Sequence, residues 1–254
     1  MNEKELILKW KNEEKNAVIT GWDFSYIDGR YCEDTSFPWD YREVIKKYLT
    51  PDMKLLDIDT GGGEFLLSIK HPFRNCAASE GYVPNVALCE KKLLPLGIDF
   101  RKGVANDLPF DNASFDIVIN RHGDFSPNEI KRVLKKGGLF ITQQVGAEND
   151  REFVELLYGR SLPLPYPEQY LCKAKEKFIS EGFRILECGE CKKPMRFYDT
   201  GALVWFCKII EWEFPLFSVD GCLEGLFKAE EQIRKYGFVE AYTHRFFLVA
   251  KLCD

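Results

Sequence analysis

The stretch Leu55–Leu67 constrains the fold of this chain more than any other. It reads LLDIDTGGGEFLL: an apolar run ending in acids, three consecutive glycines, and an apolar stretch able to begin a helix. That order predicts a buried parallel strand, a tight turn and a helix N-terminus. Glycines in such a turn can adopt φ > 0 and let the backbone approach a ligand, whose polar end the helix N–H groups favour. Three glycines alone are nevertheless better explained by an ordinary strand-to-helix turn.

Further strand signals after this turn strengthen the ligand-binding interpretation. Glu80 follows at about the 20-residue spacing at which an acid ending the second strand accepts hydrogen bonds from ribose hydroxyls. Another strand is predicted over Ser114–Asn120, and a helix, a glycine stop and a strand over Ile130–Thr142. The alternation predicts one doubly wound α/β domain with a mostly parallel, seven-stranded, Rossmann-like sheet.

This ordered set of motifs resembles the class I S-adenosylmethionine-dependent methyltransferases. The resemblance is close over roughly Asp52–Val145, and the wording DLPF…SFDIV…RVLKKGGLF is similar to the broad subgroup of small-molecule and RNA methyltransferases. It implies S-adenosylmethionine as cofactor and selects no substrate. A dinucleotide-binding Rossmann unit is the nearest rival, but its G-x-G-x-x-G fingerprint lacks the third glycine here, because Glu64, Phe65 and Leu66 follow the glycines.

The resemblance implies a cofactor site at the carboxyl edge of the sheet. Val104 stands where family members usually carry an acid that bonds the exocyclic amine of adenine. Adenine contacts could therefore come from backbone groups, Asn106 or Asp107. The candidate cofactor-binding residues are Asp57, Asp59, Thr60, Gly61, Gly63, Glu80, Gly81, Ala105, Asn106, Asp107 and Asn120.

Asp59 is a second departure, because similar proteins usually have the first glycine of the loop at this position. Its carboxylate could reach the ammonium or sulfonium of the cofactor, since opposite charges within ~4 Å attract by a few kcal/mol at intermediate dielectric. Alternatively, it crowds the site and repels the cofactor's own carboxylate. We favour crowding, because Asp57 is already the expected partner of the ammonium and a second carboxylate nearby is costly.

Arg121 and His122 are the candidate catalytic residues. They follow the strand Ser114–Asn120, and ligands bind outside the carboxyl ends of strands in such sheets. Arg121 could clamp a carboxylate of the cofactor or of the substrate. His122 could bind a ligand or act as a general base, although a solvated loop or a helix-capping histidine is a simpler interpretation. Gln144, after the next strand, could bond a substrate carbonyl or amide.

Several aromatic segments could cover this edge. The segment 21–31 contains Trp22, Phe24, Tyr26 and Tyr31 and is broken by glycines, and it could form a flap or pack on the domain's flank. Trp39 and Tyr41 are candidate pocket walls, with core packing as the simpler interpretation. The apolar helix predicted over Thr200–Trp212 is expected to be buried or to roof the pocket.

The whole chain is expected to form a single methyltransferase domain. The resemblance implies a terminal strand, Tyr242–Lys251, that runs antiparallel beside the fifth strand. The expected parts are an N-terminal lid or flank (1–50), a cofactor-binding core (51–147), and a C-terminal half with lid helices and the last strands (148–254).

Composition narrows the class of protein and its compartment. The net charge of −5 argues against a large sequence-independent nucleic-acid footprint. Nine scattered cysteines, no visible secretory signal and no apolar run of ~18 residues predict a cytoplasmic protein with free thiols. Cys188–Cys191 has the spacing of half a zinc site or a redox pair, but no second C-x-x-C completes it, so we expect no metal.

Three functions stay open on the sequence. A methyltransferase acting on a small molecule fits best, and it needs orientation more than an acid–base triad. An RNA-base methyltransferase would need a basic groove with aromatics, whereas the basic residues of Ile130–Lys136 are expected on a solvated helix face. A non-catalytic cofactor binder is the third, suggested by Asp59 and Val104. The methyl acceptor and the oligomeric state are not specified.

Overall fold

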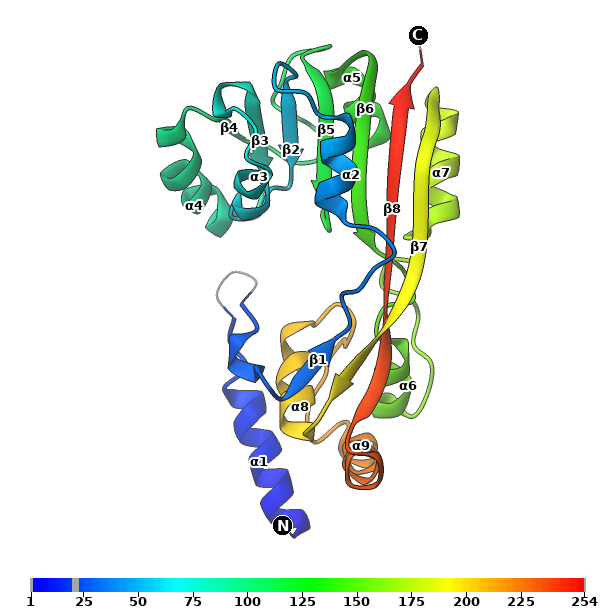
Figure 1. The fold of residues 1–254 in the computed structure, drawn as a ribbon. Coiled ribbons are helices and arrows are strands. Elements are labelled where there is room, and N and C mark those ends of the chain that lie inside the picture. Colours follow the sequence, from blue (N-terminus) through cyan, green and yellow to red (C-terminus); the bar gives the residue numbers. More distant parts are fainter. Residues whose placement is uncertain (1, 20–22, 254) are drawn as a thin grey trace. The chain divides into compact units, whose positions relative to one another are not determined.

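The computed structural model describes residues 2–19 and 23–253, so Trp22 of the predicted aromatic flap lies outside the described residues (Figure 1). The chain divides into two compact units, and each draws on segments far apart in the sequence rather than on consecutive stretches. Unit 1 comprises Met1–Phe37, Gly146–Pro167 and Cys191–His244, and unit 2 comprises Pro38–Val145, Glu168–Glu190 and Arg245–Asp254.

One sheet of eight strands has the order β1-β7-β8-β6-β5-β2-β3-β4. Strands β4, β3, β2, β5 and β6 pair in parallel, and β8 pairs antiparallel with β6, as the resemblance implied. The strands are β1 (Tyr31–Glu33), β2 (Leu55–Ile58), β3 (Cys76–Glu80), β4 (Asp99–Lys102), β5 (Phe115–Arg121), β6 (Leu134–Val145), β7 (Phe183–Phe197) and β8 (Val239–Leu252). The mixed, mostly parallel α/β fold is thereby confirmed.

The expected number of seven strands is wrong. The additional strand is β1, whose three residues pair antiparallel with the end of β7, from Tyr31 opposite Phe197 to Glu33 opposite Met195. A strand of three residues is too short to show a two-residue hydrophobic alternation in the sequence. Its pairing with β7 is a tertiary contact that the sequence pattern does not reveal.

The boundary between the helix and strand after Ser126 also differs from the prediction. The helix ends at Val133 and β6 begins at Leu134, so Gly137 and Gly138 lie inside the strand instead of closing the helix. The β5–β6 register shifts here, because Phe115 pairs with Leu134 whereas Ile117 pairs with Leu139. The glycines accommodate this irregularity, and Gly137 has φ +72°.

Two hydrophobic clusters in unit 2 cover the two faces of its parallel strands. Side chains of α2, α3 and α4 pack on one cluster with alternate strand residues such as Leu55 and Ile117. Side chains of α5 and α7 pack on the other with the intervening residues, such as Leu56 and Val118. The helices are α1 (Glu3–Lys15), α2 (Tyr41–Tyr48), α3 (Glu64–Ile69), α4 (Val83–Leu93), α5 (Pro127–Val133), α6 (Arg151–Tyr158), α7 (Leu171–Ser180), α8 (Thr200–Ile209) and α9 (Leu223–Tyr236).

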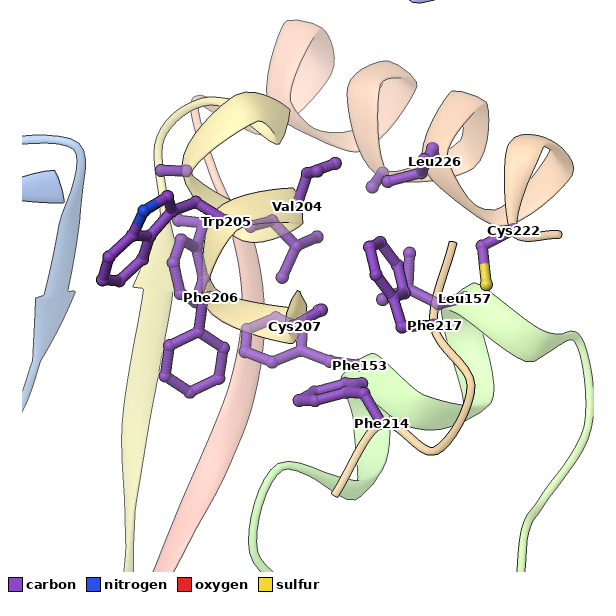
Figure 2. Packing of buried hydrophobic residues seen from close by; sticks show 14 of the residues in the cluster. Phe153, Leu157, Val204, Trp205, Phe206, Cys207, Phe214, Phe217, Cys222 and Leu226 are labelled. Atoms are coloured by element: carbon purple, nitrogen blue, oxygen red, sulfur yellow. The ribbon is translucent and has the colours of Figure 1, made fainter. Parts of the chain in front are cut away.

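The core of unit 1 is built around α8. All residues from Thr200 to Cys207 are buried, which is typical of a helix that is apolar on every face. Figure 2 shows side chains of α6 and α9, such as Phe153 and Leu226, gathered beside Val204 and Cys207 in the same cluster. The prediction that this helix is buried is confirmed. Its predicted role as a roof over the sheet edge stays a prediction.

Within residues 2–19 and 23–253, no helix is long and apolar enough to cross a membrane. The free cysteines include Cys76 and Cys89, which are buried, and Cys32 and Cys188, which are exposed. Cys188 and Cys191 both lie within strand β7 rather than in a turn. Among the same described residues, no group of three or more histidine, cysteine, aspartate or glutamate side chains could hold a metal ion.

Candidate functional site

The turn between β2 and α3 forms the base of the candidate site, in unit 2. Asp57 is buried near the end of β2 and accepts a 2.6 Å hydrogen bond from Thr60 Oγ1 through Oδ2. Gly61 and Gly63 have φ of +63° and +79°, a backbone conformation that favours glycine. A Cβ on Gly61 would meet no atom within 4 Å, whereas one on Gly63 would lie 2.8 Å from Leu93 Cδ2. The turn thus leaves open space at Gly61 and packs closely at Gly63.

Glu80 ties this turn to the end of β3. Its Oε2 accepts a 2.8 Å hydrogen bond from the Gly61 N–H, and its Oε1 accepts one of 2.8 Å from the Tyr82 N–H. The side chain is 5% exposed. An ionised carboxylate has about four acceptor positions, so each oxygen can still accept a hydrogen bond from a hydroxyl. Glu80 therefore lies where an acid can both order the glycine turn and bind a diol.

The segment proposed to meet adenine forms a tight turn beside Gly81. Asp107 N donates a 3.0 Å hydrogen bond to Val104 O, and these two residues form an isolated antiparallel bridge. Ala105 is buried, whereas Val104, Asn106 and Asp107 are exposed. A Cβ on Gly81 would lie 2.9 Å from Val104 Cγ1. Val104 therefore lies beside the residue that follows Glu80, and an apolar side chain takes the position of the usual acid.

The carboxylate of Asp59 is directed to the loop after β5. Its Oδ2 accepts a 2.9 Å hydrogen bond from the Asp124 N–H, and a Cβ on Gly123 would lie only 2.6 Å from its Cβ. Asp59 has φ +52°, a conformation that aspartate tolerates better than most residues. Asp59 thus joins the β2–α3 turn to the loop that carries Arg121 and His122, a contact not foreseen in either sequence-based interpretation.

Burial raises the pKa of both aspartates. The pKa of Asp57 rises to about 7, chiefly because burial disfavours the charged form; the Thr60 hydrogen bond lowers it, and the charges of Asp59 and Glu80 raise it further. The pKa of Asp59 rises to about 6, again mainly through burial, with the charge of Glu80 adding to it. The charge of Glu80 therefore disfavours ionisation of both Asp57 and Asp59, and the charge of Asp59 disfavours ionisation of Asp57.

Replacing Asp59 tests which of its two proposed effects dominates. We expect Asp59→Gly to bind S-adenosylmethionine a few-fold more tightly, because glycine suits φ +52° and removes a charge that opposes ionisation of Asp57. Asp59→Asn should bind S-adenosylmethionine more tightly still than Asp59→Gly, since its amide oxygen can still accept the hydrogen bond from the Asp124 N–H. Titration calorimetry of the three proteins measures this, and a loss of affinity in both variants would identify Asp59 as a cofactor ligand.

Asn120 belongs to a buried network and has no exposed surface. Its Nδ2 donates to Ile58 O at 3.0 Å and to Asp124 O at 3.3 Å, and its Oδ1 accepts from Gln144 Nε2 and from Thr142 Oγ1. Its side chain therefore holds β2, β5, β6 and the following loop together. The same contacts bury Gln144, which the sequence offered as a substrate contact.

Arg121 ends β5 and lies over an aromatic pair. Its Cζ lies 5.1 Å from the centroid of Phe65, which stacks on Tyr41 at 5.3 Å. Tyr41 is buried, and its hydroxyl donates toward Asn120 O and Ile141 O, both at 2.8 Å. Desolvation lowers the pKa of Arg121; Tyr41 opposes this shift, and the charge of Arg245 adds to it. Phe65 is a site residue that the sequence analysis did not single out.

His122 contacts Gln143, a residue that the sequence analysis did not select. The two Nε2 atoms are 3.2 Å apart, and Gln143 Oε1 accepts a 2.8 Å hydrogen bond from Trp39 Nε1. The Trp39 ring packs on Phe247 with centroids 4.9 Å apart. Trp39 therefore packs against the hydrophobic core, as the simpler interpretation expected, and its role as a pocket wall stays a prediction. Gln143 could have been found from the β5–β6 register, which pairs it with Arg121.

Comparisons with known proteins agree with this geometry. The family model of a methyltransferase domain matches residues 56–142. The phthiotriol/phenolphthiotriol dimycocerosates methyltransferase of Mycobacterium tuberculosis is 38% identical over 100 residues, which cover 35% of this chain and 36% of that protein. The match therefore spans about a third of the length of that relative.

Solved structures with low sequence identity share the fold. A protein of Bacillus halodurans C-125 proposed to be a methyltransferase has a TM-score of 0.58 at 16% identity and covers 85% of this chain and 99% of its own. A protein of unknown function from Deinococcus radiodurans R1 has a TM-score of 0.58 at 12% identity, with 94% of this chain and 98% of its own covered.

Proposed function

We propose that this chain, whose residues 56–142 match the family model of a methyltransferase domain, is a class I S-adenosylmethionine-dependent methyltransferase that transfers a methyl group from that cofactor to a small-molecule acceptor. The observation that carries the proposal is the pair of hydrogen bonds that the Glu80 carboxylate accepts from the Gly61 and Tyr82 N–H groups. It fixes an acid at the end of β3 beside a glycine turn that is open at Gly61. A nicotinamide dinucleotide is disfavoured by the missing third glycine of its fingerprint.

The residues present fit S-adenosylmethionine. Glu80 would hold the ribose hydroxyls through its remaining acceptor positions. Asp57 would pair with the ammonium through Oδ1, since its Oδ2 accepts the hydrogen bond from Thr60 Oγ1. In the turn itself, the N–H groups of Thr60 and Gly63 donate to Ser79 O and Thr60 O, so these bonds and Glu80 order the backbone beside the open space at Gly61. Backbone groups near Ala105 and the side chains of Asn106 and Asp107 remain the candidates for adenine.

The protein's main task in such a reaction is orientation. The cofactor supplies a methyl group already made electrophilic by its sulfonium. The buried network of Asn120, Thr142 and Gln144 fixes the loop that carries Arg121 and His122. Arg121 would bind an anionic group of the acceptor or of the cofactor, and orientation of this kind contributes roughly 7 kcal/mol or more in favourable cases. The catalytic roles of Arg121 and His122 stay predictions.

The identity of the methyl acceptor and the location of the protein in the cell are also parts of this proposal. The relative in Mycobacterium tuberculosis is named for phthiotriol and phenolphthiotriol dimycocerosates, but the similarity covers only 35% of this chain and 36% of that protein. A small molecule is favoured over RNA because the net charge is −5. A cytoplasmic location and the action of the whole chain as one methyltransferase are proposed on the sequence arguments given above.

Incubation with methyl-labelled S-adenosylmethionine tests the function. The full chain is offered a metabolite extract and, separately, total RNA, with Glu80→Ala as the comparison. We expect label in low-molecular-weight products that is lost with Glu80→Ala. Label in RNA alone would establish the RNA alternative. Tight cofactor binding without label in either fraction would show a non-catalytic binder, and preferential binding of a nicotinamide dinucleotide would overturn the proposal.

A further inference from the structure

Trp39, Gln143 and His122 form a chain of hydrogen bonds with a defined direction. The indole Nε1–H of Trp39 can only donate, so the atom of Gln143 that it contacts at 2.8 Å is the amide oxygen. The amide nitrogen of Gln143 therefore faces His122, with the two Nε2 atoms 3.2 Å apart. The orientation of this amide follows from the chemistry of Trp39 and needs no observed hydrogen atoms.

The direction of these hydrogen bonds determines which nitrogen of the His122 imidazole carries the proton. An amide NH₂ group is a donor only, so His122 Nε2 must accept and cannot carry a proton. A neutral imidazole whose Nε2 accepts carries its single proton on Nδ1. We propose that Trp39 and Gln143 are positioning residues that hold His122 neutral, with its proton on Nδ1.

The surrounding charges act in the same direction. The pKa of His122 lies well below its ordinary value because protein atoms desolvate the ring and because Arg245 of β8 and Arg121 of β5 disfavour a further positive charge. The side chain retains exposed surface, so desolvation counts for less than it would in a closed cavity. The hydrogen bond from Gln143 and the two arginines suffice to favour the neutral form.

The consequence for the reaction rests on the proposed function. The lone pair of His122 Nε2 is already bonded, so removal of a proton from an acceptor at that atom would require Gln143 to leave. The group that His122 offers is the Nδ1–H, a hydrogen-bond donor. Such a donor suits an acceptor with a carbonyl, phenolate or carboxylate oxygen, which it would position without taking its proton.

The other two histidines provide internal references for the opposite tautomer. His71 Nε2 lies 2.8 Å from Met53 O, and a carbonyl oxygen only accepts, so that nitrogen carries a proton. His244 Nδ1 accepts a 3.2 Å hydrogen bond from the Glu148 N–H, so its neutral form also carries the proton on Nε2. The chain has three histidines in all. The structure therefore assigns His122 as the single Nδ1–H imidazole.

Nitrogen-15 NMR of the uniformly labelled full chain at about pH 8 tests this assignment directly. Long-range proton–nitrogen correlations show which ring nitrogen is protonated, and His122→Gln identifies the signals of that residue. We expect Nδ1–H for His122 and Nε2–H for His71 and His244. An Nε2–H signal for His122 would overturn the proposal. The measurement uses neither cofactor nor acceptor, so its outcome is independent of whether the protein is a methyltransferase.

Two variants test the positioning role itself. In Gln143→Glu the carboxylate can still accept the hydrogen bond from Trp39, but it has no proton to donate to His122. We therefore expect His122 to carry its proton on Nε2 and to titrate at a higher pH than in the unchanged protein. Trp39→Phe keeps an aromatic ring on Phe247 and removes only the indole donor, so we expect a mixture of tautomers. His71 and His244 should keep their signals in both variants, which reports an intact fold. A His122 spectrum unchanged in Trp39→Phe and Gln143→Glu would refute the positioning role.

Discussion

Glu80→Ala should weaken binding of S-adenosylmethionine by roughly 1.5–3 kcal/mol, the scale for hydrogen bonds to a charged group. This corresponds to one to two orders of magnitude in Kd. The loss has two physical sources. The ribose hydroxyls lose their acceptor, and the Gly61 and Tyr82 N–H groups lose the carboxylate that orders the turn. Titration calorimetry with S-adenosylmethionine and its demethylated product measures the change.

Glu64→Ala is the matched control for Glu80→Ala. Glu64 begins α3 in the same turn, but its side chain is largely exposed and pairs with Lys92 on the surface. Exposed ion pairs contribute little, so we expect an affinity close to that of the unchanged protein. If Glu80→Ala and Glu64→Ala bind the cofactor equally well, the assignment of Glu80 to the ribose is wrong.

Affinity for S-adenosylmethionine should fall steeply as the pH drops from 8 to 6. The pKa of Asp57 is raised to about 7, mainly by burial, so in the free protein this carboxyl becomes protonated just below neutral pH. A protonated carboxyl cannot pair with the ammonium of the cofactor, so binding must release a proton. Because binding releases one proton, the affinity falls by at most about tenfold for each pH unit below pH 7. Calorimetry at several pH values gives the slope.

Asp57→Asn separates this effect from the other titrating groups. It should bind weakly at every pH, with a much flatter pH dependence, because the Asp59 carboxyl with its pKa of about 6 is then the main titrating group in this range. An unchanged pH slope in Asp57→Asn would assign the effect to another group, and a flat profile in the unchanged protein would remove Asp57 from the ammonium site.

The same pKa shift has the opposite sign for folding of the free protein. The folded-state pKa of Asp57, about 7, exceeds its unfolded value of about 3.9, so the folded state binds this proton more tightly. The contribution of Asp57 to the free energy of unfolding is therefore most favourable when the carboxyl is protonated. It declines as the pH rises from about 4 through 7. A bound cation that pairs with Asp57 would offset that decline.

The local elements of the cofactor segment could be predicted because their causes are local. An apolar run, three glycines and a second apolar run between Leu55 and Leu67 specify a strand, a turn and a helix through side-chain burial and backbone freedom. The parallel order of strands followed from their alternation with helices and from the resemblance to a known family.

Contacts between segments distant in the sequence were decided only by the tertiary structure. The hydrogen bond that Asp59 accepts from the Asp124 N–H depends on how two loops meet at the edge of the sheet. The hydrogen bonds that connect Trp39, Gln143 and His122 depend on the β5–β6 register. Shifting that register by one residue would turn the Gln143 side chain to the other face of the sheet. The sequence by itself determined that parallel strands end near Asp57, Glu80 and Asn120, but it did not reveal Phe65 or Gln143 at the same edge. Pairing and loop packing decided the partners of each carboxylate and imidazole, because a hydrogen bond requires a distance and direction that local sequence does not specify.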